Sequence, residues 1–143
     1  MALHFTNAID LDHPPERVFA LLADVARTPE WLSRCTAVEV IGSDPPASGT
    51  PLRFTFLQGE KPGVMTGTII AFEPAMRIAF HYGDKLFAIT VDFRLTKIAT
   101  GTRLIETLDI TTHTIAGKLL QPLISGVLAK ALVADLAKLR NLV

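Results

Sequence analysis

The C-terminal segment, residues 115–143, constrains the fold more than any other part of the chain. It reads IAGKLLQPLISGVLAKALVADLAKLRNLV and is rich in leucine and alanine, which predicts one long helix. In its first half the polar residues Lys118, Gln121 and Ser125 occupy a narrow arc. A helix that is apolar nearly all round needs packing partners on more than one side. Pro122 removes a backbone hydrogen bond, so we expect it to kink the helix or to mark its true start.

Alternating segments in the middle of the chain supply those partners. Phe87–Leu95 is the clearest, because every second residue is apolar, which is typical of a strand with one buried face. Short turns such as EPAM and KIATGT separate the segments, which favours an antiparallel meander. The other predicted strands of this region are Pro51–Leu57, Val64–Phe72, Arg77–Tyr82 and Thr102–Ile110.

The N-terminal part predicts a strand, two short helices and another strand. Leu3–Leu11 alternates as a strand, and DHPPERVFALLADV predicts a helix that starts after Asp12 or His13. TPEWLSR predicts a second short helix with Thr28 as N-cap and Pro29 in first position. A strand over Ala37–Ile41 and a turn-rich loop follow.

Together these elements predict an α+β fold. A curved antiparallel sheet buries its apolar face most simply by wrapping around the long C-terminal helix. Such an arrangement often leaves a concave gap between sheet and helix. The length of 143 residues fits a single domain, residues 1–143.

Composition narrows the classes of partner. Hydrophobic residues make up 49% of the chain, and the mean hydropathy is +0.36. These values predict apolar surface beyond the needs of a core, either a lined cavity or a homodimer contact. The formal net charge is zero, so we expect no nucleic-acid surface. No apolar run of about 18 residues is present, so we expect no transmembrane segment.

Motif searches argue against a metal site or a cofactor. Four histidines are scattered without HxH or HExxH spacing, and no P-loop, G-x-G-x-x-G or G-x-S-x-G motif occurs. We therefore expect neither metal nor cofactor. The single cysteine, Cys35, excludes an internal disulfide and fits a reducing, cytoplasmic compartment, and MALHFTNAID does not read as a signal peptide.

The chain resembles the Bet v 1-like, START-like (SRPBCC) superfamily, and within it the polyketide cyclase/dehydrase group. The resemblance is carried by IDLDHPPERVFALLADVARTPEWLSRCTAVEVIG, GTPLRF, FEPAMRIAF, FRLTKIATGTRLIETLDI and the closing ADLAKLRNLV, in this order over essentially the whole chain. It implies a helix-grip fold that encloses an apolar cavity, and ligand binding as the shared function. It implies no universal catalytic residue.

Glu106 is the principal candidate for chemistry. In TRLIETLDI it shares a face with apolar residues such as Leu104 and Leu108, so it is expected to face the cavity. Burial there would raise its pKa and suit it to acid–base work near neutral pH. The alternative is a carboxylate near a wet opening, or one paired with Arg53 or Arg94.

Two aromatic residues, Tyr82 and Trp31, carry a polar group on their ring. Tyr82, the single tyrosine, would offer its hydroxyl to a ligand oxygen inside an apolar wall, or lie at the core rim with that hydroxyl in water. Trp31 either lines the entrance or anchors its short helix to the sheet.

Three functional hypotheses follow. The first is binding of a small apolar molecule, such as a lipid, polyketide, isoprenoid or aromatic compound. The second is a cyclase/dehydrase- or hydratase-type enzyme in which Glu106 is acid or base and Tyr82 polarises a carbonyl. The third is a structural or interaction protein with a filled core, for which a cavity far below roughly 300 Å3 would argue. The expected ligand-binding residues are Trp31, Phe54, Phe56, Ile78, Phe80, Tyr82, Phe87, Ile89, Val91, Phe93, Leu104, Glu106, Leu108, Leu120, Ile124 and Leu128.

Overall fold

Seven strands form one antiparallel sheet in the computed structural model, which describes residues 2–143 apart from the side chains of Ala2, Leu120, Gln121 and Ile124. The sheet order is β1-β7-β6-β5-β4-β3-β2, so β1 and β2 are its edges. The strands are β1 (Ala2–Leu11), β2 (Cys35–Val40), β3 (Pro51–Gln58), β4 (Lys61–Glu73), β5 (Arg77–Gly83), β6 (Phe87–Ile98) and β7 (Gly101–Thr112). The helices are α1 (Pro15–Ala23), the 3-10 helix η1 (Val25–Glu30) and α2 (Ile115–Leu142).

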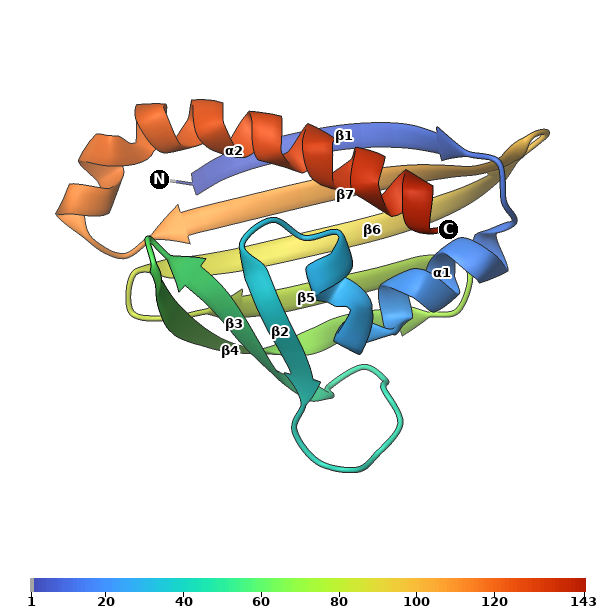
Figure 1. The fold of residues 1–143 in the computed structure, drawn as a ribbon, viewed down its shortest axis with the longest axis horizontal. Helices are drawn as coiled ribbons and strands as arrows, with labels where there is room; N and C mark the ends of the chain where they lie inside the picture. Colours follow the sequence, from blue (N-terminus) through green and yellow to red (C-terminus); the bar gives the residue numbers. More distant parts are fainter. Residues whose placement is uncertain (1) are drawn as a thin grey trace.

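Helix α2 lies across one face of the sheet along β1 and β7, and α1 lies near its C-terminal end (Figure 1). The order of elements is a strand, two short helices, six further strands and a long helix. The predicted α+β helix-grip fold is therefore confirmed.

The inner face of the sheet follows the period-two alternation of strand side chains. In β7 the even-numbered residues are buried, and the residues between them are half-buried or exposed. Backbone pairing places Glu106 of β7 between Asn7 of β1 and Phe93 of β6. Glu106 therefore lies near the middle of the buried face, as its place in TRLIETLDI predicted.

The segment after α1 differs from the prediction. Thr28 was expected to be an N-cap and Pro29 the first helical residue, but both lie inside η1. This helix ends at Glu30, and the C-cap residue Trp31 donates its backbone N–H to the carbonyl of Thr28 at 3.1 Å. Side chains three residues apart lie above one another in a 3-10 helix, so Val25 and Thr28 are buried on the same side. Burial of this pair overrides the capping preference of Thr28.

Helix α2 has two unlike halves. Thr114 caps its start by accepting a hydrogen bond from the Gly117 N–H at 3.0 Å, and Pro122 lies inside the helix without marking its start. In the second half Leu132, Leu136 and Leu139 are at most 4% exposed. We refer to a second set, spaced four residues apart in the first half, as the α2 stripe. It consists of Ile115, Leu119, Leu123 and Val127, each at least 72% exposed.

The α2 stripe bears on one expectation. The first half of the helix was expected to need partners on more than one side, and within this single chain the four described stripe side chains face solvent. The well-packed contacts of α2 within the chain lie in its second half, around Leu132, Leu136 and Leu139. None of the helices, searched over the described residues, combines the length and apolarity that a membrane span requires.

Candidate functional site

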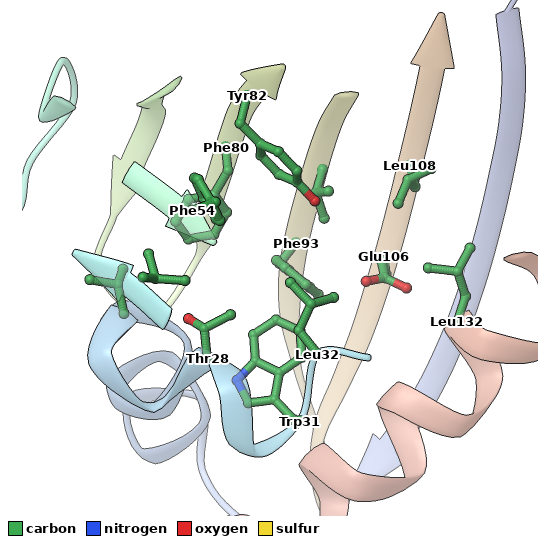
Figure 2. A pocket seen from close by; sticks show the side chains of 13 residues that line it. Thr28, Trp31, Leu32, Phe54, Phe80, Tyr82, Phe93, Glu106, Leu108 and Leu132 are labelled. Atoms are coloured by element: carbon green, nitrogen blue, oxygen red, sulfur yellow. The ribbon is translucent and has the colours of Figure 1, made fainter. Parts of the chain in front are cut away.

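A small cavity lies between the inner face of the sheet, the η1 segment and the second half of α2 (Figure 2). Its volume is about 30 Å3, which is room for one or two water molecules, since one water needs roughly 10–15 Å3. Pockets that hold drug-sized ligands measure roughly 300–1,000 Å3. The cavity is therefore too small for such a ligand in this conformation. Its lining consists of Val25, Thr28, Trp31, Leu32, Val38, Phe54, Phe80, Tyr82, Val91, Phe93, Glu106, Leu108 and Leu132.

Stacked aromatic rings form one wall of the cavity. The rings of Phe54 and Tyr82 stack with centroids 4.2 Å apart, and Phe56 continues the stack 5.8 Å from Tyr82. Gly67 of β4 makes this approach possible, because a Cβ atom there would lie 2.6 Å from Cβ of Tyr82. Tyr82 is 4% exposed, so the side chain as a whole is buried in this wall.

Trp31 forms the floor of the cavity and also anchors η1. Its ring packs edge-on against Phe93 of β6, with centroids 5.7 Å apart at 85°. The side chain is 4% exposed, and its Nε1 atom is buried with no hydrogen-bond partner among the described residues. The packing on Phe93 fits the anchoring alternative, and the low exposure does not fit a side chain at an entrance.

Glu106 places a carboxyl group in this apolar setting. It is 3% exposed, and its Oε1 atom is buried without a hydrogen-bond partner in the part of the chain that the structure describes. Burial, and then the nearby charge of Asp135, raises its pKa to about 8. The two arginines considered as partners are engaged elsewhere, Arg53 with Glu39 at 3.4 Å and Arg94 with Asp92 at 3.5 Å.

Asp135 is a second buried carboxylate, on α2, that the sequence analysis missed. It is 3% exposed and accepts hydrogen bonds from the backbone N–H of Ser33 at 3.2 Å and from the Ser33 hydroxyl. Burial raises its pKa, which the Ser33 bonds partly oppose. A signal was available, since Asp135 lies three residues after Leu132 and four before Leu139, on the buried helix face.

The predicted ligand-binding residues divide into three groups. Trp31, Phe54, Phe80, Tyr82, Val91, Phe93, Glu106 and Leu108 line the cavity. Ile78 and Leu104 are fully buried in the core, and Phe56, Phe87, Ile89 and Leu128 are partly buried against it. The side chains of Leu120 and Ile124 lie outside the described residues.

The remaining lining residues were missed because they depend on tertiary folding. Val25, Thr28 and Leu32 come from the η1 segment, Val38 from β2 and Leu132 from α2. No periodicity within one strand reveals that these segments meet above the sheet.

Neither a metal site nor a reactive thiol appears in the described part of the chain. No group of three or more His, Cys, Asp or Glu side chains there could hold a metal ion. Burial raises the pKa of the Cys35 thiol to about 11, which disfavours the reactive thiolate near neutral pH.

Comparison with a family model finds a match over the whole described chain. The family is described as "Polyketide cyclase / dehydrase and lipid transport", and its model matches residues 2–143. A relative in Mycobacterium tuberculosis, the uncharacterised protein Rv2574, is 32% identical over 122 residues, which cover 82% of this chain and 67% of the relative.

Solved structures with the same fold are more distant in sequence. The Zhui aromatase/cyclase from Streptomyces sp. R1128 superposes with a TM-score of 0.81 at 17% identity, covering 99% of this chain and 93% of that one. The protein TTHA0849 from Thermus thermophilus gives 0.77 at 19% identity, covering 99% and 95%. Ara h 8.0201 gives 0.67 at 15% identity, covering 97% and 99%. These likenesses show the fold.

Proposed function

Since the chain belongs to the polyketide cyclase/dehydrase and lipid transport family, we propose that it binds a small apolar molecule between the sheet and helix α2. The observation that carries this proposal is the buried Glu106 carboxyl group, which has an Oε1 atom without a partner among the described residues, in a cavity with aromatic walls. Buried polar groups normally have hydrogen-bond partners. A ligand oxygen would supply the missing one.

Binding requires the cavity to expand. Leu32 and Leu132 line it from opposite segments, and the Ser33–Asp135 hydrogen bonds join those segments beside it. Breaking both hydrogen bonds to this charged group costs about 3–6 kcal/mol. A ligand recovers that amount when it buries roughly 120–240 Å2 of apolar surface. Ligands that bury more than this can therefore offset the opening of the cavity.

A second candidate function is enzymatic, of the cyclase/dehydrase or hydratase type. It is favoured by the pKa of Glu106, about 8, which is suited to proton transfer near neutral pH. In a dehydration, Glu106 would give its proton to the leaving hydroxyl group, which departs as water. The resulting carboxylate would take a proton from the adjacent carbon as the double bond forms. Tyr82, whose hydroxyl points into the same cavity (Figure 2), would polarise the neighbouring carbonyl.

The third candidate, a structural protein with a filled core, is favoured by the cavity volume of about 30 Å3. Native mass spectrometry of the purified protein, with organic extraction of co-purifying molecules, separates it from the first. A bound apolar molecule of defined mass supports the binding function. The Leu132→Ala variant, which enlarges the cavity, is the matched second sample. An empty protein in both samples, with no uptake from added lipid or polyketide extracts, supports the filled core.

We also propose that the α2 stripe is the contact with a second copy of this chain. Its members, Ile115, Leu119, Leu123 and Val127, follow one another along one side of the helix. A contiguous exposed apolar row is typical of a surface that is covered in an assembly.

A further inference from the structure

Three of the polar side chains that line the cavity, Trp31, Tyr82 and Glu106, can each donate a hydrogen bond. Trp31 Nε1 carries a hydrogen and accepts nothing, and it has no partner among the described residues. Burial raises the pKa of Tyr82, so its phenol stays protonated. Glu106 is largely protonated near neutral pH and then offers an O–H group as well. The Trp31 N–H can be satisfied only by an acceptor atom, and Tyr82 and protonated Glu106 can each donate to a further acceptor oxygen of a ligand.

The charges around the cavity oppose an anionic ligand. No lysine, arginine or histidine occurs among its described lining residues. Glu106 is in the lining, and the Asp135 carboxylate is close enough to raise the pKa of Glu106. A buried anion without a cationic partner is strongly disfavoured. A ligand carboxylate would meet this cost near the Asp135 carboxylate, which has the same charge.

The donors lie at two places. The indole nitrogen of Trp31 is on the side of Thr28, whereas Glu106 lies on the side of Leu132 (Figure 2). Resting on the proposed binding function, we infer that the cavity selects neutral apolar molecules with acceptor oxygens at two places and rejects carboxylates. A protonated amine could pair with Glu106, but it would leave the Trp31 N–H without an acceptor.

A matched series of small benzene derivatives tests this inference. The members are para-diacetylbenzene, which has two neutral acceptors, and its para-acetylbenzoate, para-acetylbenzylamine and para-diethylbenzene analogues. Binding is measured by titration calorimetry. In parallel, NMR follows the indole N–H proton of Trp31, which is unambiguous because the chain has one tryptophan. We expect the diketone to bind at least about tenfold more tightly than the carboxylate, and to move the indole proton downfield where the hydrocarbon does not.

Two variants locate the effect. Trp31→Phe keeps an aromatic ring but removes the N–H, so it is expected to weaken diketone binding about three- to tenfold and leave hydrocarbon binding unchanged. Asp135→Asn keeps the shape of the side chain but removes its charge. The difference in affinity between the diketone and the carboxylate probe is therefore expected to shrink. Leu132→Ala repeats the series in a larger cavity, so that size alone cannot exclude the probes.

The outcomes separate this inference from the function on which it rests. If the carboxylate or the amine binds as tightly as the diketone, the selection for neutral acceptors is wrong while ligand binding stands. Diketone binding without movement of the indole proton also overturns the inference. If no member binds to the native protein or to Leu132→Ala, both the inference and the proposed binding of an apolar molecule fail.

Discussion

Ser33 donates two hydrogen bonds to the carboxylate of Asp135, one from its backbone N–H and one from its hydroxyl, across 102 positions of sequence. The bonds join the segment after η1 to helix α2 beside the cavity. Ser33→Ala removes the hydroxyl bond and is expected to lower the free energy of unfolding by about 1–2 kcal/mol, measured by urea denaturation. Ser48→Ala, in the exposed β2–β3 loop, is the control and should change it by less than about 0.5 kcal/mol.

Glu106 makes stability depend on pH. Its folded pKa, about 8, lies above the ordinary value of 4.5, so between these values the folded state holds a proton that the unfolded state has lost. Stability therefore falls as pH rises through this window, by up to about 1.4 kcal/mol per pH unit, and levels off above it. We expect Glu106→Gln to flatten this slope in urea denaturation series.

The control for the pH series is the exposed Glu16→Gln, which should keep the slope of the native protein. Burial also raises the pKa of Asp135, so a residual slope of the same sign is expected in Glu106→Gln. An unchanged slope in Glu106→Gln would contradict the assignment of the titration to this residue.

The two halves of α2 predict opposite responses to the same truncation. Leu139 is fully buried, so Leu139→Ala should lower the free energy of unfolding by about 2–5 kcal/mol. Leu123 is 72% exposed, so Leu123→Ala should change it by less than about 0.5 kcal/mol in the monomer. Thermal or urea denaturation at low protein concentration checks the pair. Equal losses of unfolding free energy in Leu139→Ala and Leu123→Ala would show that the first half of the helix is packed in solution.

The α2 stripe predicts self-association. Leu123→Glu places a charge in the proposed contact and is expected to shift the protein towards monomer, measured by light scattering coupled to size-exclusion chromatography. Ala137→Glu, at an exposed position in the second half of the same helix, is the control and should leave the mass unchanged. A native protein that stays monomeric at high concentration would refute the contact.

Gly67 predicts sensitivity at the aromatic wall. A Cβ atom there would lie 2.0 Å from the carbonyl oxygen of His81 and 2.6 Å from Cβ of Tyr82. Gly67→Ala should therefore push β5 away from β4 and lower the free energy of unfolding by more than about 1 kcal/mol. The loss would appear in urea denaturation, together with a change in the near-ultraviolet circular dichroism of Tyr82. An unaltered dichroism spectrum would show that the structure accommodates the added methyl group without moving Tyr82.

Local periodicity predicted the sheet and the inward position of Glu106. The reason is that a strand assigns alternate residues to opposite faces, so the register of TRLIETLDI follows from its apolar residues alone. Phe54, Phe80 and Tyr82 were placed on the inner face for the same reason, and they line the cavity.

Tertiary contacts explain what could not be predicted. The predicted start of this short helix, with Thr28 as N-cap, was wrong because burial of Val25 with Thr28 outweighs the local capping preference. The place of Asp135 on the buried face of α2 could be seen in the sequence, but its hydrogen bonds with the distant Ser33 could not. The sequence indicated apolar surface beyond the core, but an apolar helix face does not reveal whether its own chain or another molecule covers it.

Strand β1 has one neighbour among the described strands of the sheet, β7, and Ala2 pairs with Thr111 at the far end of the chain. A ribosome delivers residues at about 5–20 per second, so β1 leaves it several seconds before its partner exists. Until then Leu3, Phe5 and Ile9 have no sheet to join. The cavity wall is completed later still, when Leu132 emerges. The sheet therefore closes only after β7 has been synthesised, and until then the apolar side chains of β1 lack their partner strand.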